Sequence, residues 1–468
     1  MKALLINPPT GKYMRDERCQ VPVESRVAEP PRPPMDLAYM AAVLEQRGLK
    51  CMIKDYPMYA RNGWPVLEKD IRGFAPDFLV ISTTTPTLYD DITACTIAKH
   101  VDPHITTIAK GAHFLVFDTD VLRTFSDLDV VMRGETEMTI AEIASGSDLR
   151  RIKGITFRSS EGDLVRNEDR PLVDDLNALP YPARHLLDNA LYRTPDTGEP
   201  ITFIYTARGC PAQCLFCAAG LVSGRTLRVR TIPGVIGEIE ECVRTYHIKN
   251  FFFRADTFTW NKEWVIGLCK EIVRRRMRIR WGTNSRVDTI DAERVAWMQK
   301  AGCRVIGFGA ESGSQEILHK MRKHITVAQI EEAVRLCRAY GIDSFLHFVI
   351  GLPWDTRETI ADTARFMRKV SPSFVEVNIA YPIPGTDFYD ICSKEGLFEQ
   401  EVVGRNHISP ATRTYALSGR QLVEARKEML RQYYMRPAYI FDSLARIRSP
   451  RIAWNYCKAG YALWRSTL

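Results

Sequence analysis

Short apolar runs alternate with amphipathic stretches along the first 146 residues. The apolar runs predict buried parallel strands, and apolar residues at every third or fourth position predict helices. The predicted strands are Ala3–Asn7, Cys51–Lys54, Phe78–Ser82, Thr106–Ala109 and Val130–Met132. The predicted helices are Asp36–Arg47, Asp91–Lys99 and Thr136–Ala144. Repeated strand–helix units of this length predict a doubly wound parallel sheet whose ligand lies at the carboxyl ends of the strands.

A second series of strand–helix units begins at Ile201. Its predicted strands are Ile201–Thr206, Asn250–Arg254, Arg280–Asn284, Val305–Gly309, Ser344–Ile350 and Phe374–Ile379. Its predicted helices are Pro233–Tyr246, Glu263–Arg276, Ala292–Ala301, Thr326–Tyr340 and Arg357–Val370. Six units are too few to close an eight-stranded barrel. The pattern therefore predicts a partial (β/α)6 barrel that is open on one side.

The predicted organisation is that of an α/β protein with four regions. Residues 1–146 form the doubly wound domain, and residues 147–200 form a linker that contains a hairpin of Gly154–Arg158 and Asp163–Arg166. Residues 201–395 form the partial barrel. Residues 396–468 form a helical tail that is rich in aromatic and basic residues.

The composition is that of a soluble globular protein, with 45% hydrophobic and 26% charged residues. The N-terminus lacks the apolar core of a secretory signal, and no apolar stretch approaches the roughly 20 residues of a membrane-spanning helix. We therefore expect a cytoplasmic protein with reduced thiols. Nine of the twelve cysteines are scattered singly, which is no disulfide framework.

The net charge of +8 is unevenly distributed. Residues 431–468 carry seven basic side chains and one acidic one, so this segment contributes +6. The remainder is close to neutral, which argues against nucleic acid as a partner. Arginines interleaved with Trp and Tyr predict either a packed helical lid or a surface that lies on anionic lipid headgroups.

Three cysteines follow the first strand of the second series. Cys210, Cys214 and Cys217 have the spacing Cys-x-x-x-Cys-x-x-Cys, preceded by Gly209. Three thiolates in one tight loop can hold three irons of a [4Fe–4S] cluster and leave the fourth iron open to another ligand. A structural zinc site is the alternative, but it normally needs two pairs of ligands, and no second pair follows.

This loop and its surroundings resemble the radical S-adenosylmethionine (SAM) superfamily, over nearly the whole chain. The matching segments, similar to the successive strand-end motifs of the cobalamin-binding branch, are Asn250–Trp260, Trp281–Asp288, Gly302–Ser314, Gly351–Thr356 and Tyr381–Phe388. The resemblance implies that the open iron binds the methionine moiety of SAM. Reductive cleavage then gives a 5′-deoxyadenosyl radical, with an external electron donor such as flavodoxin or ferredoxin.

The resemblance also implies cofactor contacts outside the cysteines. Phe216 resembles the aromatic residue beside the adenine, and Arg286 the basic residue that meets the SAM carboxylate. Glu311, followed by Ser312, resembles the acid near the ribose and the amino group. Asp256 stands at an acidic strand end, but here Phe253-Arg254-Ala255-Asp256 replaces the Gly-Gly-Glu found in many members. For Asp256 and Arg286, a salt bridge at the barrel rim is the alternative.

The first domain resembles the cobalamin-binding domain that precedes this core in one large branch. The matching loops follow the strands, and the residues that we expect to contact cobalamin are Ser82, Thr83, Thr84, Gly111, His113, Gly134 and Glu135. Many methyl-transfer proteins carry a cobalt-ligating histidine in Asp-x-His-x-x-Gly, but residues 55–60 read Asp-Tyr-Pro-Met-Tyr-Ala. We therefore predict cobalamin without a histidine lower ligand, and His113 as a contact to its nucleotide tail or a surface residue.

Two radical reactions agree with the resemblance. One is C-methylation of an unactivated carbon, and the other is oxidative ring closure, as in the anaerobic magnesium-protoporphyrin monomethyl ester cyclase and the hopanoid ring-forming enzyme. The tail is similar to that of the hopanoid relatives, which suggests a small hydrophobic or lipid-like substrate and peripheral membrane contact. The alternatives are a tRNA methylthiotransferase-like enzyme and a non-enzymatic cobalamin or iron–sulfur sensor.

Overall fold

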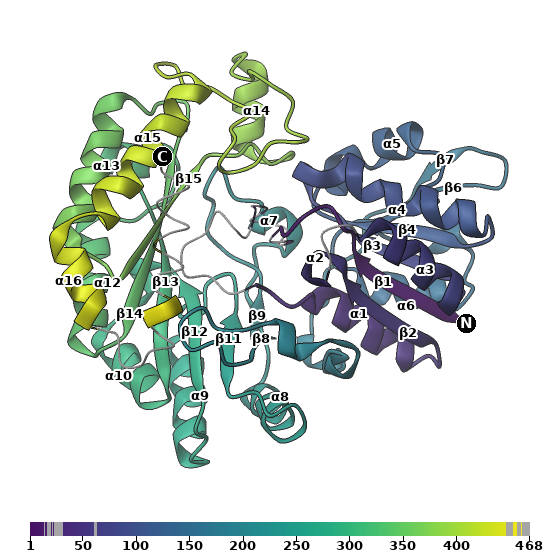
Figure 1. Ribbon diagram of the computed structural model, residues 1–468, viewed down its shortest axis with the longest axis horizontal. Coiled ribbons are helices and arrows are strands. Elements are labelled where there is room, and N and C mark those ends of the chain that lie inside the picture. The colour runs from purple at the N-terminus through teal and green to yellow at the C-terminus, as the bar shows by residue number, and fades with distance from the viewer. Residues whose placement is uncertain are drawn as a thin grey trace.

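The computed structural model describes residues 1–13, 15, 20, 22, 31–59, 63–445, 453–455 and 460. Two sheets lie side by side, each with its own helices (Figure 1). One contains seven strands from the N-terminal part of the chain, and the other contains six strands from the second series. A small hairpin that carries the three cysteines lies between them (Figure 1).

The N-terminal sheet has the strand order β2-β1-β3-β4-β5-β6-β7. Its strands are β1 Lys2–Asn7, β2 Lys50–Asp55, β3 Phe78–Ser82, β4 Thr106–Lys110, β5 Val130–Met132, β6 Ile155–Arg158 and β7 Leu164–Arg166. Its helices are α1 Met35–Glu45, α2 Tyr56–Tyr59, α3 Trp64–Phe74, α4 Leu88–Val101, α5 Phe114–Thr124 and α6 Glu137–Ala144. The first five strands are parallel, which confirms the predicted doubly wound fold.

The predicted hairpin is not a free linker. Strand β6 pairs antiparallel with β5, and β7 pairs with β6, so the N-terminal sheet extends to Arg166, beyond the boundary predicted at residue 146. The buried carboxylate of Asp118 on α5 holds this extension, because it accepts hydrogen bonds from Thr156 of β6 and Arg166 of β7. These partners are far apart in the sequence, and local patterning therefore could not reveal the pairing.

Three helices of this domain were not predicted: α3, α5 and the four-residue α2. In α3 the buried side chains Leu67, Ile71 and Phe74 follow the helical period, so the signal was present in the sequence. In α5 the core-facing position 118 carries an aspartate, paired with Arg133 at 3.2 Å, and this buried charge interrupts the apolar pattern. The pairing that makes a charged residue acceptable in the core is a tertiary feature.

The second sheet has the order β15-β14-β13-β12-β11-β8, and all of its strands are parallel. Its strands are β8 Ile201–Tyr205, β11 Asn250–Arg254, β12 Arg280–Ser285, β13 Cys303–Glu311, β14 Asp343–Ile350 and β15 Phe374–Ile379. Strands β8 and β15 are not paired with each other, so the barrel is partial, as predicted. Its helices are α8 Ile232–Thr245, α9 Lys262–Arg274, α10 Ala292–Lys300, α11 Gln315–Lys320, α12 Val327–Ala339 and α13 Arg357–Val370.

The C-terminal region packs against the last barrel strand. Helix α14 is Asp387–Lys394, α15 is Gly419–Tyr434 and α16 is Pro437–Ala445. Arg426 of α15 donates a hydrogen bond to the Val377 carbonyl oxygen, and the Tyr434 hydroxyl donates one to the Val375 carbonyl oxygen. The first part of the predicted tail is therefore a packed cover. Residues 446–452, 456–459 and 461–468 lie outside the described residues.

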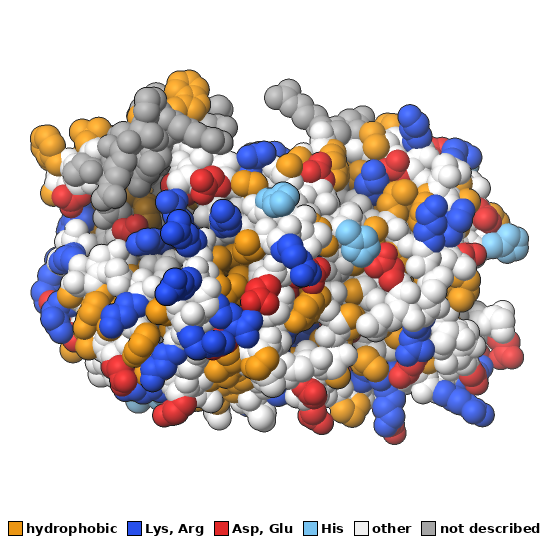
Figure 2. Space-filling model, turned by 90° about the horizontal axis from the view of Figure 1, so that it is seen from below, with side chains coloured by type: hydrophobic (Ala, Val, Ile, Leu, Met, Phe, Trp, Pro, Cys, Tyr) orange, Lys and Arg blue, Asp and Glu red, His pale blue; other side chains and the backbone are white. Residues whose placement is uncertain are grey.

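Positive charge is not confined to the tail. Figure 2 shows one face of the molecule. On this face, Lys and Arg side chains gather in the left half, which corresponds to the barrel in Figure 1. Some of the exposed basic side chains of α9 are paired, since Arg274 and Arg275 both contact Glu271. Exposed pairs of this kind contribute little to stability.

A buried group of charges joins the linker to the barrel. Arg184 and Glu238 are fully buried, and an Arg184 Nη2 atom lies 2.5 Å from Glu238 Oε1. Arg230 binds the other carboxylate oxygen. Arg184 also donates a hydrogen bond to the Phe203 carbonyl oxygen of β8. One carboxylate on α8 thus compensates two guanidinium groups.

We expect Glu238→Gln to lower the free energy of unfolding by about 3 to 5 kcal/mol, because it leaves two buried guanidinium groups without a counter-charge. Urea unfolding followed by circular dichroism measures this change. The matched control is Glu240→Gln on the same helix, whose half-exposed carboxylate pairs with Arg275 and should matter by less than about 1 kcal/mol. Equal losses in both variants would contradict the assignment.

Candidate active site

The cysteine loop is enclosed by a small hairpin. Strand β9 Ala207–Arg208 pairs antiparallel with β10 Arg228–Val229, and residues 209–227 run between them. The loop is tied to the barrel, because the Leu215 amide donates to the Met321 carbonyl oxygen and the Phe388 amide donates to the Leu215 carbonyl oxygen. The loop is therefore held at the carboxyl ends of the barrel strands.

Gly209 is required at the entry to the loop. Its φ of +94° lies in the left-handed region, and a Cβ atom there would lie 2.0 Å from the Thr226 carbonyl oxygen. Its amide donates a 2.7 Å hydrogen bond to Asp256 Oδ2. Asp256, predicted as a cofactor contact, therefore shapes the turn into Cys210.

Two of the three loop cysteines differ from the other described cysteines in their exposure. Cys214 and Cys217 are partly exposed, whereas Cys210 and the described cysteines outside the loop are buried. Burial raises the pKa of the Cys242, Cys269 and Cys337 thiols to about 12, so these thiols are inert. Cys214 and Cys217 are therefore the most accessible of the described thiols, and Cys210 lies in the same loop.

Among the described residues, no three His, Cys, Asp or Glu side chains converge on a point that could hold one metal ion. A cubane cluster has a different requirement, since each cysteine binds a different iron and the three sulfur atoms need not converge. Three thiols in one loop, two of them partly exposed, therefore fit a [4Fe–4S] cluster.

Cationic side chains surround this loop. Arg286 Nη1 lies 3.9 Å from Cys214 Sγ, and Arg286 Nη2 donates to the Lys323 carbonyl oxygen at 2.8 Å. The Asp288 carboxylate also binds Arg286, so the predicted salt bridge exists beside the contact with the cysteine. The positive charge of Arg286 is suited to a thiolate cluster and to a carboxylate ligand.

Lys323 is a site residue that the sequence analysis missed. Its Nζ atom lies 2.6 Å from Glu311 Oε1, and both side chains are buried. Burial is the largest single effect and lowers the pKa of Lys323, but Glu311 and Cys214 together raise it by more, so the pKa lies above its ordinary value. Lys323 follows the strand end by twelve residues, and only the path of the chain through α11 brings it back to Glu311.

The backbone makes room for this ion pair. A Cβ atom on Gly309 would lie 2.3 Å from Glu311 Oε1 and 2.7 Å from Lys323 Nζ. Glu311 itself has a φ of +63°, an unusual value for a side chain of this size that often marks a functional position. Ser312 bonds to Thr363 and to the Ser314 amide, so its hydroxyl shapes the loop. Phe216 is partly buried against the barrel core.

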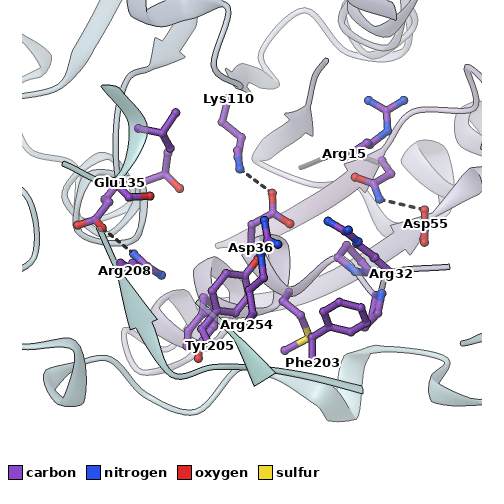
Figure 3. Close-up of a pocket in the computed structure, with 18 of the residues that line it drawn as sticks. Arg15, Arg32, Asp36, Asp55, Lys110, Glu135, Phe203, Tyr205, Arg208 and Arg254 are labelled. Atoms are coloured by element: carbon purple, nitrogen blue, oxygen red, sulfur yellow. Dashed lines mark hydrogen bonds and ion pairs between the residues drawn. The ribbon is translucent and has the colours of Figure 1, made fainter. Parts of the chain in front are cut away.

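A cavity lies between the two sheets and is lined by residues of both (Figure 3). Asp36 and Lys110 of the N-terminal domain face Tyr205, Arg208 and Arg254 of the barrel domain across it. The Lys110 ammonium lies 2.6 Å from the Asp36 carboxylate. The carboxyl edges of the two sheets thus share one cavity.

The predicted cobalamin contacts do not all lie on this cavity. Gly134 and Glu135 line it, and Ser82 is adjacent through a hydrogen bond to Asp36. Thr83 and Thr84 are buried and bond to the Lys110 carbonyl oxygen and to Thr87. Gly111 allows the backbone to approach Thr83, since a Cβ atom would lie 2.5 Å from Thr83 Oγ1. His113 lines a different cavity.

Glu135 and Glu137 bind the cysteine hairpin. Arg208 contacts both carboxylates, and an Arg228 Nη2 atom lies 2.9 Å from Glu135 Oε1. Burial is the largest single effect and raises the pKa of the Glu137 carboxyl, but Arg208, a backbone hydrogen bond and Lys110 together lower it by more, and the pKa lies below its ordinary value. Glu135 also accepts a hydrogen bond from the Val173 amide. In this structure, Glu135 is therefore occupied by contacts between the domains.

Comparison with known proteins supports the interpretation of the cysteine loop. The family model of the radical SAM superfamily matches residues 204–367. An uncharacterized methyltransferase of Pyrococcus horikoshii is 30% identical over 455 residues, which cover 95% of each chain. This chain belongs to the radical SAM superfamily. It is a radical SAM enzyme. The alternative of a non-enzymatic sensor is therefore set aside.

Other relatives span most of this radical SAM enzyme. The anaerobic magnesium-protoporphyrin IX monomethyl ester cyclase of Rubrivivax gelatinosus is 26% identical over 418 residues, covering 87% of this chain and 75% of the relative. Among solved structures, the radical SAM methyltransferase TsrM from Kitasatospora setae, with cobalamin and a [4Fe–4S] cluster bound, matches with a TM-score of 0.69 at 16% identity and 99% coverage of both chains. The cobalamin-dependent enzyme OxsB matches with a TM-score of 0.74, 16% identity and coverage of 100% and 71%. These structures confirm the two-domain fold.

The depressed pKa of Glu137 predicts a pH-dependent contribution of the domain contact to stability. This contribution is present above the ordinary pKa of 4.5 and is lost as the pH falls through the lower pKa of the folded state. We expect Glu137→Gln to cost about 3 kcal/mol at pH 7 and to flatten this dependence, as measured by urea unfolding from pH 7 to about pH 3. The control, Glu142→Gln on the same helix, should keep the wild-type slope. Parallel curves for wild type and Glu137→Gln would refute the assignment.

Proposed function

We propose that this radical SAM enzyme methylates an unactivated carbon of a small molecule with the help of a bound cobalamin. The observation that carries the proposal is the shared cavity. The edge of the N-terminal sheet, through Asp55, Lys110 and Gly134, and the barrel, through Arg254 and Asp256, line the same space. A radical generator on one edge and a methyl donor on the other could therefore reach one substrate.

On the barrel side, we propose that Cys210, Cys214 and Cys217 hold the cluster and that Arg286, Lys323 and Glu311 hold SAM. When bound, the cluster supplies the electron that cleaves SAM to a 5′-deoxyadenosyl radical. Arg286 and Lys323 offer cations to the SAM carboxylate, and Glu311 offers an acceptor to its amino group or ribose hydroxyls. Their burial excludes water, which strengthens these contacts and protects the reaction.

On the N-terminal side, the residues present fit a ligand rich in amide groups. Asn7 stands at the end of β1, lines the cavity and is 6% exposed. Its Oδ1 atom has no hydrogen-bond partner among the described residues, so it is available to an N–H donor such as a carboxamide side chain of cobalamin. When bound, cobalamin supplies the methyl group.

A cobalamin without a histidine lower ligand remains part of the proposal. The described residues that line the shared cavity include no histidine, and residues 55–59, at the end of β2, continue directly into α2. Asp55 at that strand end binds Asn7 and the Tyr192 hydroxyl, which leaves this carboxylate engaged with the protein.

The cavity lining favours a substrate with polar groups. Charged side chains from both domains face the space, among them Arg32, Asp36, Lys110, Arg208 and Arg254 (Figure 3). Burying a wholly hydrocarbon substrate against these groups would leave them desolvated at a cost of free energy. A small polar molecule therefore fits this lining better than the lipid-like substrate that the tail suggested.

Ring closure is the second candidate reaction, because the cyclase of Rubrivivax gelatinosus also spans 87% of this chain. Methylation is favoured by the relative with 95% coverage, which is named a methyltransferase. A putative methylthiotransferase of Methanocaldococcus jannaschii covers only 57% of this chain, which gives less support to the tRNA-modifying alternative.

The electron donor and the membrane contact stay predictions. The resemblance to radical SAM enzymes implies a flavodoxin- or ferredoxin-type donor, which would reduce the cluster that cleaves SAM. Helix α16 exposes Ile440, Phe441 and Leu444, which suits contact with a lipid surface. Among the described residues, no helix is both long and apolar enough to cross a membrane.

Isotope labelling distinguishes the two reactions. The anaerobically reconstituted enzyme is incubated with reductant, a metabolite extract and SAM that carries a deuterated methyl group. Methylation predicts a product that gains the deuterated methyl group, whereas ring closure predicts a product that has lost hydrogen and carries no label. If neither labelled product nor 5′-deoxyadenosine forms with both cofactors present, the proposed function is wrong.

The cluster assignment has its own variant. We expect Cys214→Ala to lose the iron–sulfur absorption in the visible range and the cleavage of SAM, because two thiolates cannot hold the cluster with one open iron. Cobalamin should still bind, and its cobalt(II) resonance spectrum should show no splitting from a nitrogen ligand. The control is Cys392→Ala, which removes a buried thiol and should retain the cluster. Retention of SAM cleavage in Cys214→Ala would overturn the assignment.

A further inference from the structure

A second cavity, of about 540 Å³, lies outside the proposed active site. It is bounded by α4 and α5 of the N-terminal domain and by α14 and residues 398–403 of the C-terminal region. Its size is typical of sites for small organic ligands. None of its lining residues lines the cavity between the two sheets.

Aromatic rings form much of its wall. Ring centroids lie 5.3 Å apart between His113 and Phe117, 6.2 Å between Phe117 and Tyr389, and 5.3 Å between Tyr389 and Phe398. Tyr89 and Phe125 form a further pair at 5.8 Å, so that rings stand on several sides of the space. Aromatic faces carry partial negative charge and attract organic cations.

His113 provides a polar group inside this cavity. It is 5% exposed, and its Nδ1 atom has no hydrogen-bond partner among the described residues. Burial lowers the pKa of His113 to about 4, so the imidazole is neutral at physiological pH. A neutral imidazole has one acceptor nitrogen, which can accept a hydrogen bond from an N–H donor.

The charged side chains that line this cavity are all acidic. Asp120, Glu399 and Glu401 line the cavity, and no lysine or arginine is among its described lining residues. Asp120 is paired with Arg123, and Glu399 accepts a hydrogen bond from the Gly419 amide. Glu401 is exposed and forms no ion pair among the described residues. The electrostatic environment therefore favours a positively charged ligand over an anion.

We propose that this cavity is a binding site for a protonated amine with an aromatic or aliphatic body. The aromatic walls receive the body and attract the charge, His113 accepts a hydrogen bond from the ammonium group, and the rim carboxylates balance it. A bound amine would contact both α5 and residues 398–403. It would thereby join the N-terminal domain to the C-terminal region.

Calorimetric titration of the anaerobically purified holoenzyme tests the proposal. The probe is 2-phenylethylamine, and its uncharged counterpart is 2-phenylethanol, which has a similar shape. We expect the amine to bind about tenfold more tightly, because only the amine has the charge that the rings and carboxylates attract. The amine should also raise the melting temperature, since a ligand that binds only the folded state stabilises it.

Substitutions of two lining residues test whether the amine binds in this cavity. Glu401→Gln changes an exposed side chain, preserves the fold and should weaken amine binding severalfold, and His113→Phe should weaken it further. The control, Glu68→Gln, removes an exposed carboxylate on α3 and should leave binding unchanged. Absence of amine binding, equal affinity for the alcohol, or unchanged affinity in both site variants would each overturn the proposal. None of these measurements depends on SAM cleavage, so they are independent of the proposed reaction.

Discussion

The carboxylates of Glu135 and Glu137 and the guanidinium groups of Arg208 and Arg228 form a buried ion-pair network on which the arrangement of the two domains depends. Buried charges are tolerated only when they are paired, so separating the domains would require each group to recover its water. Glu135 lies just beyond the end of β5, and Arg208 lies two residues before the first loop cysteine. The same four residues that dock the domains therefore bring the edge of one sheet to the cysteine loop of the other.

Within the barrel, two glycines leave the space that the cysteine loop and the charged side chains occupy. Gly209 allows the turn into the cysteine loop, and Gly309 leaves the space that Glu311 and Lys323 occupy. The left-handed backbone of Glu311 turns this carboxylate back toward the strand end. Local strain is retained because the surrounding sheet and helices determine the path of the chain on both sides. The result is a compact group of opposite charges beside the Cys214 thiol.

The C-terminal region provides a second contact between the halves of the molecule. The Gly404 amide donates to the Pro86 carbonyl oxygen, and the Tyr381 hydroxyl donates to the Val402 carbonyl oxygen. These bonds bring residues 398–403 over α4 and α5, where they complete the aromatic cavity. The chain thus crosses from the barrel back to the N-terminal domain.

Local sequence patterns determined much of this protein. The strands of the two large sheets, the partial barrel and the cysteine loop follow from apolar periodicity and from residues that are adjacent in the chain. Only the tertiary structure decided that β6 and β7 extend the first sheet, that Glu135 binds Arg208 and Arg228, and that Lys323 joins Glu311. Each of these depends on groups that are distant in the sequence or face one another across a domain boundary. A buried charge is acceptable only beside its partner, and one strand or helix read alone does not contain that partner.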